Sequence, residues 1–183
     1  MSEYTLKDGR TLVLRDPAIA DAPEMVEYLK IVGGETDFLL CDENGIDGLT
    51  VEGEEEWIRT TLSAPNTKMF IGTVEGEIVL VCDVRGCNSR KRIAHNAVVA
   101  ISIKRAFWHL GIGSIAMRSM IDYAKSTGEL RTLSLEVRDG NERAIELYKR
   151  FGFREIGRHK GRIHIRKTYY DEILMDLDVS EVQ

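Results

Sequence analysis

Residues Ile101–Ala116, ISIKRAFWHLGIGSIA, pass from an apolar run through a turn with two glycines into a helical pattern. Glycines at 111 and 113 allow the backbone to come close to a bulky anion. The first turn of a helix presents free N–H groups and the positive end of the helix dipole, which together suit a diphosphate. The segment therefore predicts a strand, an anion-binding turn and a helix in succession.

The same turn allows other interpretations. Gly111, Gly113 and Ala116 also satisfy GxGxxA, the dinucleotide-binding fingerprint. A Rossmann domain places this fingerprint after its first strand, whereas here about 100 residues precede it and only about 70 follow. The P-loop pattern GxxxxGK[ST] occurs nowhere in the sequence. A turn without ligand and an NAD(P)H-dependent reductase remain as alternatives, the latter predicting NAD(P)H binding and no coenzyme A binding.

Strand-like runs precede this segment. They lie at about 68–74, 77–84 and 93–103, and Glu75–Gly76 forms a tight turn between the first two, as in an antiparallel hairpin. The third run is continuously apolar from Ala97 to Ile101, which is typical of a central strand covered on both faces.

The N-terminal part begins with a predicted strand over residues 10–15. Asp16 is expected to cap a helix that has Pro17 at its first position and ends before Gly33. The stretch 35–49 has no sustained period and is predicted to be a loop.

Helices and strands alternate in the rest of the chain, so the order is mixed α/β with one βαβ crossover among antiparallel strands. The expected elements are a helix from Thr50 to before Pro65 that buries Trp57, Ile58 and Leu62, a helix over about 111–127 stopped by Gly128, a strand at 131–138, a helix capped by Asn141 and closed by Gly152, and two strands within 153–178.

Composition narrows the class of protein. The chain has 183 residues, 43% apolar and 30% charged, which predicts one domain over residues 1–183. No apolar run approaches the roughly 18 residues of a membrane span, and the N-terminal residues lack the order of a signal peptide, so a cytoplasmic protein without membrane contact is expected. Three cysteines without a CxxC pair and four histidines without ligand spacing argue against a metal site or a disulfide framework.

Charge is unevenly distributed. The net charge is −5, but residues 1–61 carry 15 acidic and 5 basic side chains, while residues 62–183 carry 15 acidic and 20 basic ones. This balance argues against a nucleic-acid-binding protein. Either the N-terminal part is a solvated acidic surface, or it faces a cationic ligand while the rest faces an anionic one.

A second motif follows at residues 141–153, NERAIELYKRFGF. Together with the glycine turn, it resembles the GNAT superfamily of acetyl-CoA-dependent N-acetyltransferases, and most closely the ribosomal-protein-alanine acetyltransferase-like branch. The positions that match the second cofactor motif of that family are Asn141, Ala144, Leu147, Tyr148, Gly152 and Phe153. One departure is Trp108, which stands where the family usually has Arg or Gln.

The resemblance implies a mixed, mostly antiparallel central sheet of about seven strands flanked by about four helices. It also implies transfer of acetyl from acetyl-CoA to a primary amine by direct attack through a tetrahedral intermediate, without a metal. The acceptor is then a protein N-terminus, a polyamine or another small amine. A homodimer is among the assemblies that the family allows.

The resemblance further implies which residues bind acetyl-CoA. The backbones of Ile101 and Ile103 would pair with the pantetheine arm as though it were another strand. Asn141 would both cap its helix and contact the cofactor, two roles that compete for one side chain. The remaining cofactor-binding positions are His109, Leu110, Gly111, Ile112, Gly113, Ser114 and Ala144.

The resemblance also implies the catalytic residues. Tyr148 would be the general acid for the leaving thiolate, and Glu136 the general base for an amine that arrives charged. Strict alternation in RTLSLEVR places Glu136 with Ser134 and Arg138 on a polar face, where a solvated or Arg-paired carboxylate is the alternative. His95 or a water molecule could serve as base instead, and Val98 stands near a position where some members carry a glutamate.

Two further regions are expected to border the ligands. The acidic loop 35–38 would line the acceptor site, in keeping with a cationic amine. The basic residues that could meet the cofactor phosphates are Lys149, Arg150, Arg154 and Arg158. A non-catalytic acyl-CoA-binding sensor is the alternative from another functional class, although the presence of both Glu136 and Tyr148 favours turnover.

Overall fold

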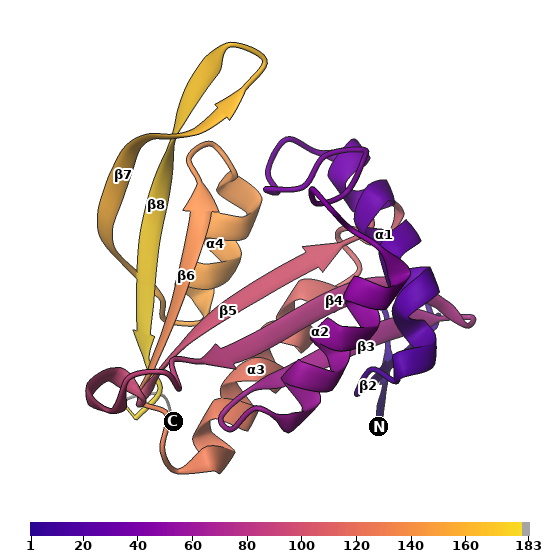
Figure 1. The fold of residues 1–183 in the computed structure, drawn as a ribbon, viewed down its shortest axis with the longest axis horizontal. Coiled ribbons are helices and arrows are strands. Elements are labelled where there is room, and N and C mark those ends of the chain that lie inside the picture. The colour runs from indigo at the N-terminus through magenta and orange to yellow at the C-terminus, as the bar shows by residue number, and fades with distance from the viewer. Residues whose placement is uncertain (181–183) are drawn as a thin grey trace.

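One sheet of eight strands forms the centre of the computed structural model, which describes residues 1–180 (Figure 1). The strand order is β1-β2-β3-β4-β5-β6-β8-β7, and every neighbouring pair is antiparallel except β5 and β6. The strands are β1 (Ser2–Thr5), β2 (Thr11–Arg15), β3 (Lys68–Val74), β4 (Glu77–Gly86), β5 (Asn96–Ile103), β6 (Thr132–Arg138), β7 (Arg154–Ile165) and β8 (Thr168–Asp178). The mixed α/β class and the single parallel crossover are confirmed, and β1 is the strand beyond the expected number of about seven.

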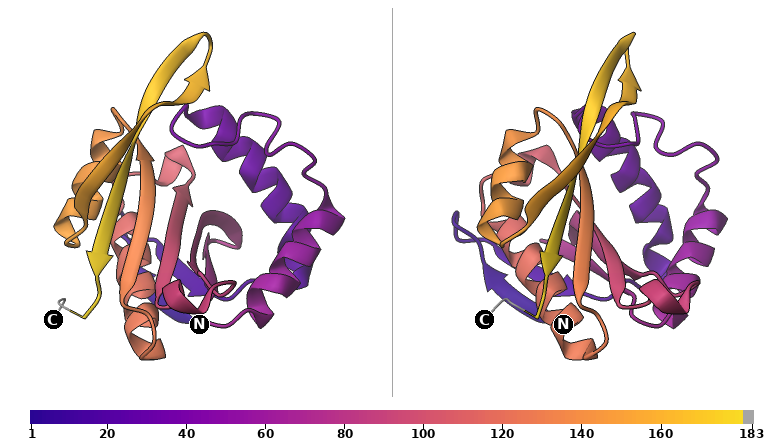
Figure 2. Two further views of the ribbon diagram at one scale, coloured as in Figure 1. Left: turned by 60° about the vertical axis from the view of Figure 1, so that its left-hand side comes forward. Right: turned by 90° about the vertical axis from the view of Figure 1, so that its left-hand side faces the viewer.

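Four α-helices cover the sheet, two on each face (Figure 2). They are α1 (Ala22–Glu35), α2 (Val51–Ser63), α3 (Ile112–Thr127) and α4 (Glu142–Arg150). Helices α1 and α2 pack with β3 and β4 around a smaller core, whereas α3 and α4 share the larger core with most of the strands. No helix within residues 1–180 is long and apolar enough to cross a membrane.

Glycine turns and caps fix most element boundaries as expected. Glu75 and Gly76 both have positive φ and close the β3–β4 hairpin. The Thr50 side chain accepts a hydrogen bond from Gly53 N at the start of α2, and Gly128 ends α3 in the left-handed conformation. These local signals act within four residues, which is why the sequence alone places them correctly.

The predicted boundaries of the first helix are wrong at both ends. A short 3₁₀ turn at Ile19–Asp21 comes first, and Asp21, not Asp16, precedes α1. The carboxylate of Asp21 is held by Arg15 at 2.7 Å, while Asp16 pairs with Lys68. At the other end α1 continues through Gly33 to Glu35.

Gly33 stays helical because another segment packs directly against it. A Cβ atom at this position would lie 2.0 Å from the carbonyl oxygen of Asp42, in the α1–α2 connection. The glycine therefore serves the close approach of two backbones, and this contact outweighs the roughly 1 kcal/mol by which glycine disfavours a helix relative to alanine.

Two expectations about burial are also corrected. On α2, Ile58 is buried as predicted, but Leu62 is 51% exposed, and Glu54 and Thr61 lie inward instead. On β5, Ala97 and Val99 are buried, but Val98 on the opposite face is 37% exposed. Strand β5 is therefore central but covered on one face only at this point.

Gly33→Ala is expected to destabilise the protein by about 2–4 kcal/mol, because the new methyl group meets a backbone carbonyl that cannot move alone. Gly34→Ala is the matched control. Its Cβ would lie 3.3 Å from Cβ and 3.6 Å from Cα of the exposed Glu43, so improved helix propensity should leave stability equal or higher. Urea unfolding of both variants checks this, and equal losses would contradict the packing argument.

Candidate active site

The sheet opens between β5 and β6 (Figure 1). These strands pair only from Asn96–Val98 to Thr132–Ser134. Beyond that point β5 stays bonded to β4 as far as Ile103, and β6 stays bonded to β8 as far as Arg138. In the middle of the sheet, the edges of β5 and β6 therefore face each other across a gap without hydrogen bonding to one another.

Ile101 and Ile103 turn their backbone groups toward this opening. Cys87 N donates to the Asn96 carbonyl, and Lys104 N donates to the Val79 carbonyl, so even-numbered residues of β5 bond to β4. In an antiparallel pair the intervening residues direct their N–H and C=O groups the other way. Both backbone groups of Ile101 and the N–H group of Ile103 are thus available to a ligand lying along β5, while the two side chains pack against the larger core.

Trp108 fixes the end of β5. Its indole N–H donates to the Ile103 carbonyl at 2.8 Å, and the Arg143 guanidinium of α4 lies 3.3 Å from its ring centroid. One side chain therefore connects β5, the following turn and α4. This contact gives a structural reason for tryptophan at a position where Arg or Gln was expected.

The turn after β5 exposes backbone N–H groups. His109 and Gly111 have φ of 67° and 95°, and Gly111 directly precedes α3. Ser114 N donates to the Gly111 carbonyl, whereas no acceptor in residues 1–180 takes the N–H of Gly111, Ile112 or Gly113. With Leu110, these residues make up the turn for which anion binding is predicted, and their free N–H groups lie at one end of the opening.

The two glycines of this turn serve different purposes. A Cβ at Gly111 would meet nothing within 4 Å, so its conformation and open surroundings suit an approaching anion. A Cβ at Gly113 would lie 3.0 Å from Leu147 Cδ2 of α4. Gly113 therefore also lets α3 and α4 approach closely, a role that the sequence did not indicate.

Tyr148 lies on α4, on the α3/α4 side of the sheet, with 7% of its surface exposed. Its ring packs at 6.0 Å from that of Phe153. Burial raises the pKa of Tyr148 to about 12, against a smaller opposing effect of the Arg143 charge. No group within residues 1–180 hydrogen-bonds the hydroxyl, which therefore remains a protonated, unengaged donor at neutral pH.

Asn141 caps α4 as predicted. Its side-chain oxygen accepts from Ala144 N at 3.4 Å, a long hydrogen bond. The capping role is observed, and Ala144 lies partly buried against the larger core.

Glu136 lies on the other face of the sheet. Leu133, Leu135 and Val137 are buried toward α3 and α4, so the alternation places Glu136 and Arg138 on the α1/α2 side. Glu136 is exposed and has no ion-pair partner in residues 1–180, so the Arg-paired alternative does not apply to this part of the chain. Tyr148 and Glu136 thus approach the opening from opposite faces of the sheet.

His95 is distant from these residues. It precedes β5 at the closed end of the opening, where its carbonyl accepts from Arg131 N. It lies six positions before Ile101, or about 20 Å away at the usual rise per strand residue. The structure does not bring His95 to the residues proposed for chemistry.

Residues 35–38 border the opening on the α1/α2 side. The Glu35 carboxylate accepts from Arg105 N at 2.7 Å. Asp37 lies 3.5 Å from Arg166 of the β7–β8 hairpin, and the Phe38 ring lies against Arg138. Among the basic candidates for phosphate contact, Arg158 is already paired with Asp139 and Glu155, whereas Lys149, Arg150 and Arg154 are exposed.

Asp83 was not predicted from the sequence. It lies on β4 opposite Ala100 of β5, on the α1/α2 face, and is 6% exposed. Arg85 Nε lies 2.8 Å from its Oδ1, but the pair is poorly aligned, and this oxygen has no hydrogen-bond partner in residues 1–180. Burial raises the pKa of Asp83 to about 6, with Arg85 opposing the shift. The signal was an aspartate inside the apolar run EIVLVCDV.

The pH dependence of stability tests this buried carboxyl. Since its folded pKa lies above the unfolded value, Asp83 lowers stability as pH rises from about 4 through about 6. Asp83→Asn removes this dependence. The stability of the variant relative to wild type should rise by up to about 3 kcal/mol between pH 4 and 7, measured by urea unfolding. If the difference in unfolding free energy between Asp83→Asn and wild type is the same at pH 4 and pH 7, the raised pKa of Asp83 is contradicted.

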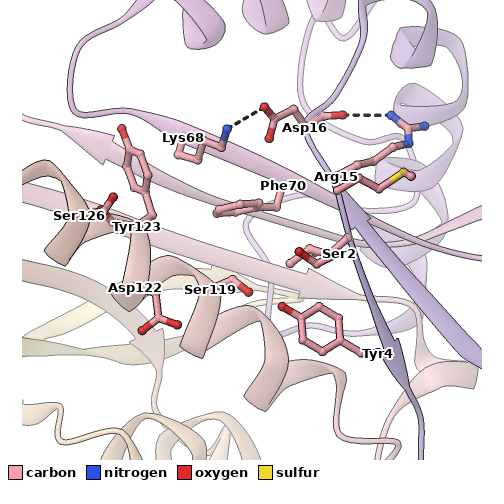
Figure 3. A pocket seen from close by; sticks show the side chains of 12 residues that line it. Ser2, Tyr4, Arg15, Asp16, Lys68, Phe70, Ser119, Asp122, Tyr123 and Ser126 are labelled. Carbon is pink, nitrogen blue, oxygen red and sulfur yellow. Dashed lines mark hydrogen bonds and ion pairs between the residues drawn. The ribbon is translucent and has the colours of Figure 1, made fainter. Parts of the chain in front are cut away.

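A separate hollow of about 380 Å³ lies between the N-terminal strands and α3 (Figure 3). Its charged groups are largely satisfied within the chain. Lys68 pairs with Asp16 at 2.7 Å, and the Tyr123 hydroxyl donates to the Thr67 carbonyl. It contains none of the residues predicted to bind the cofactor or to act in catalysis.

Comparison with known proteins agrees with this geometry. Residues 38–153 match the acetyltransferase (GNAT) family. The L-amino acid N-acetyltransferase AaaT of Escherichia coli is 28% identical over 65% of this chain and 73% of its own length.

Solved structures share the whole fold. The acetyltransferase of GNAT family from Streptococcus pneumoniae is 31% identical, with a TM-score of 0.86 over 91% of this chain and 98% of that one. YncA of Salmonella typhimurium, solved with acetyl-CoA, is 14% identical with a TM-score of 0.80 over 93% and 95% of the two chains. The chain therefore belongs to the acetyltransferase (GNAT) family of acetyl-CoA-dependent N-acetyltransferases.

Proposed function

We propose that the opening between β5 and β6 holds acetyl-CoA and that a primary amine on the α1/α2 side attacks its thioester. The observation that carries this proposal is the edge of β5, where the N–H and C=O groups of Ile101 and the N–H group of Ile103 face the opening without a strand partner, while the Ile103 carbonyl accepts from Trp108. An extended amide-containing arm can add to such an edge as a further strand does. The turn at residues 109–114 lies at the end of this edge and would bind the diphosphate.

The proposed proton transfers follow from the positions of Glu136 and Tyr148, which approach the opening from opposite faces of the sheet. Glu136 accepts a proton from the ammonium group, so that the neutral amine can attack the carbonyl carbon. The new C–N bond gives a tetrahedral intermediate, and the C–S bond then breaks. Tyr148 donates a proton or a hydrogen bond to the leaving sulfur, and its raised pKa keeps the hydroxyl protonated until then.

The acceptor is proposed to be a small amine or a protein N-terminus. The acidic groups Asp37, Asp83 and Glu136 border the α1/α2 side and would attract a cation. The three cysteines are free thiols, in keeping with a reducing compartment, and we place the enzyme in the cytoplasm.

Thiol release tests the proposal. The purified chain is incubated with acetyl-CoA and a panel of amino acids, peptides, polyamines and other amines, and free coenzyme A is detected with a thiol reagent. Amine-dependent release is expected, together with a heat of acetyl-CoA binding in calorimetry. Binding without release over the whole panel would favour an acyl-CoA sensor, and absence of binding at millimolar concentration would overturn the assignment of the site.

A further inference from the structure

We propose that Arg138 binds the carboxylate of a free α-amino acid acceptor whose ammonium group lies at Glu136. The inference rests on the proposed function and specifies its substrate class. Arg138 is the last residue of β6 and shares the α1/α2 face with Glu136, beside the opening.

Two aromatic rings hold the Arg138 side chain. Its Cζ lies 3.7 Å from the ring centroid of Tyr170 on β8 and 4.9 Å from that of Phe38 in the α1–α2 connection. Guanidinium groups stack on aromatic faces, and such contacts restrict the orientation of the planar group. Segments about 130 residues apart in the sequence therefore combine to position one cation.

The charge of Arg138 has no carboxylate partner in residues 1–180. Its Nε atom is buried without a hydrogen-bond acceptor, whereas its terminal nitrogens are not among the buried groups. Glu172 stands opposite Arg138 in the register but is engaged by His159 at 3.2 Å and lies 3.8 Å from Arg162. A guanidinium that is held in place and unpaired suits bidentate binding of a ligand carboxylate.

The spacing fits one amino acid. Arg138 and Glu136 are two residues apart on one strand face, so their Cα atoms are about 6.6 Å apart. An α-amino acid carries its ammonium and carboxylate groups on the same carbon, and two long side chains at this spacing can reach both. A polyamine offers no carboxylate, and the first residue of a protein offers an amide in its place.

The surroundings limit the size of the acceptor. The α1–α2 connection and the tip of the β7–β8 hairpin lie near each other at the open end of the sheet (Figure 2), where Asp37 and Arg166 are 3.5 Å apart. Phe38 and Tyr170, which flank Arg138, belong to these two segments. This arrangement encloses the cation and favours a small acceptor over a long peptide.

Matched substrates test the inference. The amino acids that support thiol release are each compared with their carboxamide and with the corresponding decarboxylated amine. Wild type should prefer the free acid by about 100-fold in kcat/KM, and Arg138→Gln should lose about that factor for the acid while changing the amide by less than about threefold. Arg138→Lys keeps the positive charge but not the planar guanidinium group that binds a carboxylate through two hydrogen bonds. It should therefore recover only part of the loss in kcat/KM for the free acid. Phe38→Leu, which removes one ring, should raise KM for the acid with little change in kcat.

The outcomes separate the two proposals. Equal use of acids and amides by wild type, or an equal loss for both in Arg138→Gln, would overturn the carboxylate assignment and leave the acetyltransferase reaction in place. Lack of thiol release with every amine would contradict the proposed function itself. Calorimetric binding of acetyl-CoA by Arg138→Gln checks that the variant is folded.

Discussion

Tyr148→Phe is expected to lower kcat by about 10²–10³-fold, because it removes the donor proposed for the leaving sulfur. The ring, which packs against Phe153 in the larger core, remains. KM for acetyl-CoA should change little, since the turn and the β5 edge that are proposed to bind it are unaffected. Thiol release at saturating acetyl-CoA and amine measures the effect.

The stability of this variant supplies an internal check. The Tyr148 hydroxyl has no hydrogen-bond partner in residues 1–180, so its removal leaves no unpaired group behind, and Tm should stay equal or rise. Tyr123→Phe on α3 is the matched control. Its hydroxyl donates to the Thr67 carbonyl at 3.1 Å, so this variant should lose about 1 kcal/mol of stability at unchanged kcat. A Tyr148→Phe enzyme with wild-type kcat would exclude the tyrosine as general acid.

Elements with local signals could be predicted from the sequence. The β3–β4 hairpin, the alternation in β6, the cap at Asn141 and the turn before α3 each depend on a few neighbouring residues. The motif around Tyr148 could also be found, because its positions lie on one short helix. In these segments local preference and tertiary packing favour the same structure.

Features that depend on distant segments could not be predicted. The apolar run of β5 indicates a buried strand, but its separation from β6 after Val98 is a property of two strands and is absent from either sequence pattern. In the sequence Gly33 looks like the end of a helix. Its actual role is the close contact with Asp42, and the helical pattern around Gly33 contains no sign of that distant residue. The contacts of Arg138 with Phe38 and Tyr170 likewise bring together a loop and a strand that are far apart in the sequence, and no spacing rule predicts them.

Glu136→Gln is expected to lower kcat/KM by about 10²-fold near pH 7, with a deficit that shrinks as pH rises. An α-amino group has a pKa near 8, so at pH 7 most acceptor molecules carry a proton that a base must remove. Above about pH 9 the neutral amine predominates, and a base contributes less. Glutamine preserves the size of the side chain on this exposed strand position, so the fold should be unaffected. Rates of thiol release from pH 6.5 to 9.5 for both proteins measure the change.

The pH profile distinguishes a base from a group that only attracts the substrate. An electrostatic role would raise KM for charged acceptors, while kcat would keep the same ratio to wild type at every pH. Glu146→Gln on α4 removes another exposed carboxylate and should leave both constants unchanged. If kcat of Glu136→Gln is lower than that of wild type by the same factor at every pH, Glu136 is excluded as the base. The buried Asp83 on the same face, opposite Ala100 of β5, has a pKa of about 6 that makes it an anion at pH 7, and it would then be the candidate to accept the proton.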